Sequence, residues 1–201
     1  MNTTQSATPE VPDVVIFQRH VIGLDLSLTG TGVAVSRGDH NDVSLATIST
    51  RADNGSIAGF STRCAAIANM IDDHARSAGA NPMSLAYAVE GLSLHSKSSS
   101  LDRIFASWWM ILAELRQLGW PEPSIISPNE RAMYATGKGN ANKEAVLLAS
   151  VRRYPLVDIS DNNQADATVI MAMLRRHLGA PIEAPLPQTH LRALEKVRWA
   201  A

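Results

Sequence analysis

The chain has 201 residues, of which 45% are hydrophobic and 18% are charged, and its formal net charge is −1. This length and composition are typical of one soluble globular domain with a sizeable core. No apolar run is long enough for a transmembrane helix and the N-terminal residues do not resemble a secretory signal, so we expect no membrane association. The single cysteine, Cys64, excludes an internal disulfide and a cysteine zinc site and favours a reducing, cytoplasmic location.

Charge is distributed unevenly along the chain. Residues 1–130 carry 8 Lys or Arg and 13 Asp or Glu, whereas residues 131–201 carry 10 and 6. Within 131–153 a single acid accompanies five basic residues, which are Arg131, Lys138, Lys143, Arg152 and Arg153. This asymmetry permits a phosphate-binding surface on a nearly neutral protein, although a solvated basic face gives the same pattern.

The N-terminal half predicts a short sheet and a helix. Residues 1–12 are small and polar and are expected to form a disordered tail. Short apolar runs separated by turn residues then predict an antiparallel meander of three strands, over 21–26, 32–35 and 43–48. Apolar residues at helical spacing predict a helix over 59–78, which Gly79 ends.

The C-terminal half alternates helices and strands. Strands are predicted over 85–89 and 124–127, and helices over 101–118, from Pro128 onward, over 142–153 and over 164–178. The last residues, 180–201, are expected to form a Pro-rich basic tail with a short helix. A meander followed by alternating elements predicts an α/β fold with a mixed sheet flanked by helices.

Three acidic residues stand in apolar surroundings. Asp25 lies within the first strand, Glu90 ends a later strand, and Asp166 opens an apolar helix. An ionised carboxylate among apolar residues is costly unless another charge compensates it. A divalent cation such as Mg²⁺ or Mn²⁺ would compensate all three, because hard cations prefer oxygen ligands. The alternative is three unrelated acids at a turn, a strand end and a helix start.

Four segments of the sequence resemble the motifs of the RuvC family of Holliday-junction resolvases, in the order and at the spacing of that family. They are IGLDLSLTGTG at 22–32, AVE at 88–90, ATGKGNANK at 135–143 and DNNQADA at 161–167. Together they extend over residues 21 to about 178, and the loop at 135–143 is most similar to that of phage-type members.

The resemblance implies a ribonuclease H-like nuclease domain over residues 13–179, with a five-stranded mixed sheet and helices on both faces. It also implies a homodimer whose two active sites cut opposite strands of four-way DNA junctions. Asp25, Glu90 and Asp166 take the place of the catalytic metal ligands. The implied reaction is phosphodiester hydrolysis with two divalent ions, Mg²⁺ or Mn²⁺. A phage-encoded member would act in the cytoplasm of the bacterial host.

The sequence departs from the family at two positions. The family has Asp or His three residues before the last acid, where this chain has Asn163. The resemblance therefore leaves open whether Asn163 or Asp161 supplies a further metal ligand, or whether the second metal is weakly held. Asp161 also suits the N-cap of the helix. Cellular members have an aromatic residue three positions after the strand-end glutamate, where this chain has Ser93. We therefore expect a looser choice of sequence and branch type.

Other residues are candidates for DNA contact or assembly. Lys138 and Lys143 flank a glycine-bearing loop that could approach a phosphate closely, and Arg131 is a weaker candidate. The adjacent Trp108 and Trp109 must point in different directions on their helix, so one is expected to meet the core and the other a partner surface. Among the six histidines we retain only His95 as a possible site residue.

Three other functions compete with this prediction. The Asp-x-x-x-Thr-Gly-Thr turn also resembles the phosphate-binding hairpin of actin-like sugar kinases, but 201 residues without a repeat cannot form the two lobes that they need. A non-catalytic binder of branched DNA would have no use for buried like charges. Only a panel of substrates would distinguish a ribonuclease H-like enzyme that acts on RNA or RNA–DNA hybrids from the predicted DNA endonuclease.

Overall fold

The computed structural model describes residues 19–38, 42–92 and 101–200. A five-stranded sheet forms its centre, with the strand order β3-β2-β1-β4-β5. The strands are β1 (Val21–Asp25), β2 (Thr31–Ser36), β3 (Val43–Ile48), β4 (Ala86–Glu90) and β5 (Ser124–Ile126). β1, β2 and β3 form an antiparallel meander, whereas β1, β4 and β5 run parallel. The predicted α/β fold with a five-stranded mixed sheet is confirmed.

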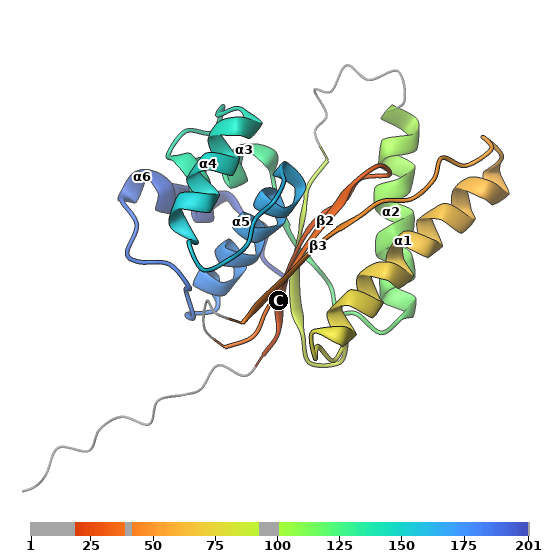
Figure 1. The fold of residues 1–201 in the computed structure, drawn as a ribbon, viewed down its shortest axis with the longest axis horizontal. Coiled ribbons are helices and arrows are strands. Elements are labelled where there is room, and N and C mark those ends of the chain that lie inside the picture. The colour runs from red at the N-terminus through yellow and green to blue at the C-terminus, as the bar shows by residue number, and fades with distance from the viewer. Residues whose placement is uncertain (1–18, 39–41, 93–100, 201) are drawn as a thin grey trace, which may run out of the picture.

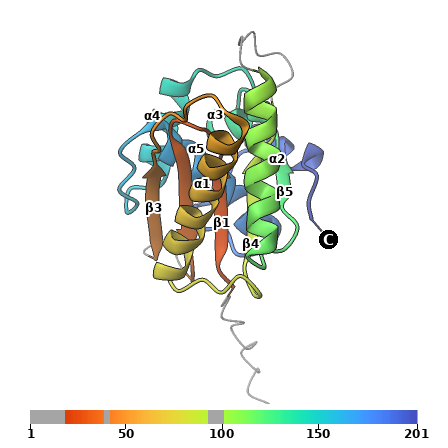
Figure 2. The same cartoon turned by 90° about the vertical axis from the view of Figure 1, so that its right-hand side faces the viewer.

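Helices cover both faces of the sheet, as Figures 1 and 2 show. One face carries α1 (Ile57–Ser77) and α2 (Leu101–Gln117). The other carries α3 (Pro128–Thr136), α4 (Lys143–Arg153) and α5 (Asn162–His177). Each face encloses its own cluster of buried apolar side chains, so the sheet separates two hydrophobic cores.

Helix α5 lies directly on β1 and β2, because two glycines allow a close approach. A methyl group at Gly23 would overlap the carbonyl oxygen of Ala167, and one at Gly32 would overlap that of Asn163. Glycine inside a strand often marks such a backbone contact. The two glycines therefore set how near the start of α5 comes to the end of β1.

The residues after α5 pack against the domain. They form α6 (Gln188–Leu191) and a 3₁₀ helix (Arg192–Lys196), both of which contact α3. Arg198 then pairs with Ile125 of β5 in an antiparallel bridge. The segment 180–201, expected from the sequence as a basic tail, thus contributes buried side chains to the second core.

Some sequence predictions fall outside the described part of the chain. They concern the tail at 1–12, Ser93 and His95. Within the described ranges, every helix is too short or too polar to cross a membrane.

Candidate metal centre

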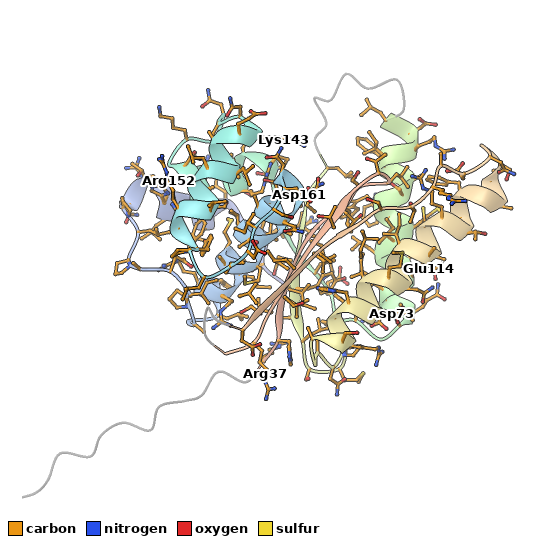
Figure 3. The ribbon with its side chains drawn as sticks, in the orientation of Figure 1. Arg37, Asp73, Glu114, Lys143, Arg152 and Asp161 are labelled. Carbon is orange, nitrogen blue, oxygen red and sulfur yellow. The ribbon has the colours of Figure 1, made fainter. Side chains whose placement is uncertain are left out.

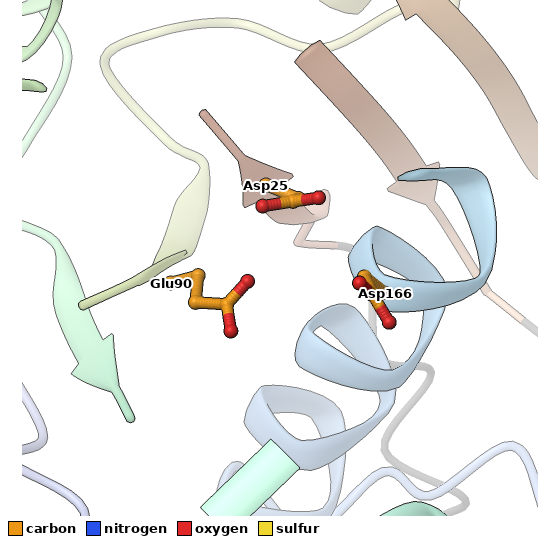
Figure 4. Close-up of side chains that lie close together, drawn as sticks. All are labelled: Asp25, Glu90 and Asp166. Carbon is orange, nitrogen blue, oxygen red and sulfur yellow. The ribbon is translucent and has the colours of Figure 1, made fainter. Parts of the chain in front are cut away.

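Three carboxylates meet at one edge of the sheet. Asp25, Glu90 and Asp166 each offer one carboxylate oxygen, and these oxygens all lie within 4.8 Å of one another. Figure 4 shows the three side chains converging from the ends of two strands and from one turn of α5. Hard oxygen donors from three separate elements, gathered this closely, suit a divalent cation such as Mg²⁺ or Mn²⁺.

The topology of the sheet explains this convergence. β1 and β4 are parallel neighbours, with Leu24 opposite Val89, so their last residues Asp25 and Glu90 emerge at the same edge. The packing of α5 on β1 brings Asp166 to them from one side. The indole nitrogen of Trp108 donates a hydrogen bond of 2.8 Å to the Glu90 carbonyl oxygen and thereby fixes the strand end to α2.

Burial and a nearby like charge both raise the pKa of Glu90. The pKa of Glu90 is raised to about 8, chiefly because burial disfavours the carboxylate and also because Asp25 carries a like charge nearby. The positive charges of Arg131 and Lys143 act in the opposite direction. When all are ionised, the three acids carry one charge more than these two basic residues, so binding of a cation to the site is favourable.

Arg131 lies inside the carboxylate group. Its side chain is only 8% exposed, its Nη2 atom lies 3.2 Å from Glu90 Oε1, and its Nη1 atom forms an ion pair with Asp166 Oδ1. It belongs to the first turn of α3, which a reciprocal capping box between Ser127 and Glu130 holds in place. The sequence suggested Arg131 as a phosphate contact on the surface, whereas the structure buries it against the acids.

A cavity opens beside the carboxylates. It has a volume of about 460 Å³ and is lined by the three acids, Arg131, Lys143 and a wall of apolar side chains that includes Ile104 and Trp108. Lys143 is exposed at the start of α4, where the Asn142 side chain caps the helix by accepting from the Ala145 N–H. Figure 3 shows Lys143 at the same end of the molecule as Asp161.

Asp161 lies outside the three-carboxylate group. It is the N-cap of α5: Oδ1 accepts from the Gln164 N–H at 2.8 Å, and Oδ2 accepts from the Thr47 hydroxyl at 2.6 Å. This is the capping role that the sequence left open. The amide of Asn163 lies against Gly30 in the turn between β1 and β2.

The other three basic residues of the segment 131–153 line a separate groove beside α4. This groove, of about 760 Å³, includes Lys138, Arg152 and Arg153. Lys138 and Arg152 are exposed, but Arg153 donates to the carbonyl oxygens of Tyr134 and Ala135 at the end of α3. Arg153 therefore stabilises the C-terminus of that helix.

The two tryptophans of α2 face different environments, as predicted. Trp108 is 6% exposed and belongs to the first core, whereas Trp109 is 63% exposed. Their rings meet edge to face with centroids 4.9 Å apart.

Sequence reasoning missed the contributions of four residues to the site, which are Arg131, Trp108, Gly23 and Gly32. The inward direction of Arg131 and the hydrogen bond from Trp108 depend on how α3 and α2 lie over the sheet, and no local pattern reports this. Gly23 did carry a signal, because it interrupts an apolar strand.

The fold is similar to that of solved RuvC structures. Thermus thermophilus RuvC in complex with a Holliday junction substrate aligns with a TM-score of 0.59 and 18% identity, over 84% of this chain and 100% of that one. A second Thermus thermophilus RuvC structure aligns with a TM-score of 0.54 and 19% identity, over 83% and 99%. No protein-family model and no curated protein matches the sequence. At this identity the similarity establishes a RuvC-like fold.

Proposed function

We propose that this protein is a metal-dependent endonuclease that hydrolyses phosphodiesters in four-way and other branched DNA. The observation that carries the proposal is the convergence of Asp25, Glu90 and Asp166 beside an open cavity with an exposed lysine at its rim. The RuvC-like fold supports it, since one of the similar structures holds a Holliday junction substrate.

The three carboxylates are the proposed ligands of the divalent ions. Their oxygens are close enough to share a cation, and burial together with the like charge of Asp25 raises the pKa of Glu90. Asn163, three residues before Asp166 and on the same side of α5, is the proposed further ligand. When bound, the ions would supply Lewis-acid activation of water and of the scissile phosphate, as in other sites with two metal ions.

The remaining residues of the site would hold the DNA. Lys143 lies at the rim of the cavity, where its ammonium group can neutralise a phosphate beside the carboxylates. Lys138, in the neighbouring groove, is the proposed contact for a phosphate further along the strand. The apolar wall that includes Ile104 and Trp108 would limit the access of water around the reacting group.

Resolution of a junction needs two cuts, so we also propose a homodimer with one site in each subunit. The exposed Trp109 on α2 supports an interface on this helix, because tryptophan is enriched at the centres of interfaces. An enzyme of this kind would act in the cytoplasm of a bacterial cell, on recombination or replication intermediates.

The test is cleavage of a labelled four-way junction with Mg²⁺ or Mn²⁺. A linear duplex, a replication fork and an RNA–DNA hybrid run alongside, and Asp25→Asn is the control. We expect paired nicks near the junction centre that the variant does not make. Cleavage of forks as well would indicate a general debranching nuclease. Preference for the hybrid, or binding without cleavage, would contradict the proposal.

A further inference from the structure

We propose that Arg131 is an internal counter-ion of the carboxylate group and that a divalent cation displaces it on binding. This inference rests on the proposed function, because it concerns the same site. It assigns to the arginine a role in tuning metal affinity, which differs from that of a ligand or of a permanent phosphate contact.

The guanidinium group of Arg131 lies between two of the carboxylates. It pairs with Glu90 through Nη2 at 3.2 Å and with Asp166 through Nη1, so it contacts two of the three proposed ligands. One carboxylate oxygen of each proposed ligand lies within 4.8 Å of the others, close enough for them to bind a common cation. The arginine and a divalent ion therefore compete for the same carboxylates.

The guanidinium group of Arg131 lacks some of the hydrogen bonds that it could form. Its Nε atom is buried and has no hydrogen-bond partner among the described residues. A buried donor without a partner is unfavourable, so the attraction of the carboxylates must hold the side chain there. A divalent ion that neutralises these carboxylates would remove that attraction.

The cavity beside the carboxylates offers space for the displaced side chain of Arg131. Arg131 lines the 460 Å³ cavity together with Lys143. The capping box of Ser127 and Glu130 fixes the backbone of the first turn of α3, so the side chain can rotate while the helix stays in place. A displaced guanidinium would then lie near Lys143 and add a second positive charge on the side from which a phosphate enters.

A purely structural arginine predicts the opposite behaviour. If Arg131 served to hold the carboxylates in their binding arrangement, its removal would disorder them and weaken metal binding. As a counter-ion it opposes metal binding, since it attracts the ligand oxygens and repels the incoming cation. The direction of the change in metal affinity therefore separates the two roles.

The experiment is a calorimetric titration of the metal-free, full-length protein with MnCl₂. We expect Arg131→Met to bind Mn²⁺ about tenfold more tightly than the wild type. Arg37→Gln is the matched control, because Arg37 is exposed at the opposite end of the sheet from Lys143 (Figure 3), and its affinity should equal that of the wild type. Circular dichroism checks that each variant is folded.

A second variant covers the case in which Arg131→Met does not fold. Arg131→Lys keeps the charge but loses the two-point contact, and we expect its Mn²⁺ affinity to exceed that of the wild type by about threefold. Equal or weaker binding by a folded variant would overturn the inference and leave the nuclease proposal standing. If neither the wild type nor the variants bind Mn²⁺, the counter-ion role and the proposed metal-dependent function both fail.

Discussion

At the scale of single residues, the carboxylate group opposes folding when no cation compensates it. Burial disfavours the charge of Glu90, and the like charge of Asp25 adds to that cost. Because the pKa of Glu90 is higher in the folded than in the unfolded state, its contribution to stability is present at low pH. That contribution is lost as the pH rises through about 8. Functional sites commonly carry such a cost in stability.

We therefore predict that Asp25→Asn stabilises the metal-free protein while abolishing cleavage. Removing one negative charge lowers the pKa of Glu90 toward its ordinary value, so the gain should be larger at pH 9 than at pH 6. A gain of about 1 kcal/mol at pH 9 is expected for the loss of one repulsive pair. Urea denaturation in EDTA at the two pH values measures it. A variant that is less stable at pH 9 would contradict the repulsion argument.

Asp161 provides a contrast with Asp166 on the same helix. Its carboxylate caps α5 and accepts from Thr47, away from the metal centre. We predict that Asp161→Ala lowers the free energy of unfolding by about 1 kcal/mol, as the loss of an N-cap does. Its Mn²⁺ affinity should stay within about twofold of the wild type at a temperature where the variant is folded. Loss of Mn²⁺ binding by the folded variant would instead make Asp161 a ligand.

At the scale of elements, the docking of α5 on β1 assembles the site. Gly23 lies opposite the backbone of Ala167 and Met171, with no space for a methyl group. We predict that Gly23→Ala displaces α5 and destabilises the fold by about 1–3 kcal/mol. The displacement also moves Asp166 away from Asp25 and Glu90, so Mn²⁺ affinity should fall by at least about tenfold.

The control for this prediction is Gly38→Ala. Among the described residues nothing lies within 4 Å of a methyl group at Gly38, although its positive φ of 68° makes the substitution strained. We expect it to lose some stability but to retain Mn²⁺ affinity. Equal loss of Mn²⁺ affinity in the two variants would show that general destabilisation, rather than the position of α5, controls the site.

The N-terminus of α4 is the element that we expect to contact DNA. Lys143 is exposed at its first position and lines the cavity of the site. We predict that Lys143→Ala weakens junction binding and reduces the slope of log affinity against log salt by about 1. Binding measured by fluorescence anisotropy over a series of salt concentrations tests this. An unchanged slope would remove Lys143 from the DNA contacts.

Most elements could be predicted from the sequence because their signals are local. Apolar runs of strand length marked β1 and β4, and Pro128 marked the start of α3. The residues at which the elements begin and end were less predictable. α5 begins at Asn162, two residues before the predicted start, because the side chain of Asp161 caps it from the preceding position. Local sequence patterns indicate which residues form an element, but they say little about the residues at which it begins and ends.

At the scale of the whole molecule, the sheet separates two layers of helices that contribute different residues to the site. The layer of α3, α4 and α5 supplies Arg131, Lys143 and Asp166, and the strand ends supply the other two acids. The layer of α1 and α2 supplies Trp108, which fixes the strand end. The sequence motifs predicted which acids converge. They could not predict the inward direction of Arg131 or the pairing of Arg198 with β5, because both depend on packing between distant segments.

The layer of α1 and α2 presents an exposed aromatic side chain. Trp109 lies on α2 and is largely exposed, while its neighbour Trp108 contributes to the core. The proposed homodimer needs an interface that leaves each cavity open to DNA. An exposed tryptophan on a well-packed helix suits such an interface, because a rigid aromatic ring loses little entropy when buried.

We therefore predict that Trp109→Glu converts a dimer into a monomer, which sedimentation velocity would detect. The variant should retain the Mn²⁺ affinity of the wild type, since Trp109 is not a metal ligand. Its cleavage products should differ, because one site cuts one strand. On a plasmid with an extruded cruciform, the dimer gives linear DNA by paired cuts within one binding event, whereas the monomer gives nicked circles. Linear product at the wild-type rate from a monomeric variant would show that paired cutting does not require this interface.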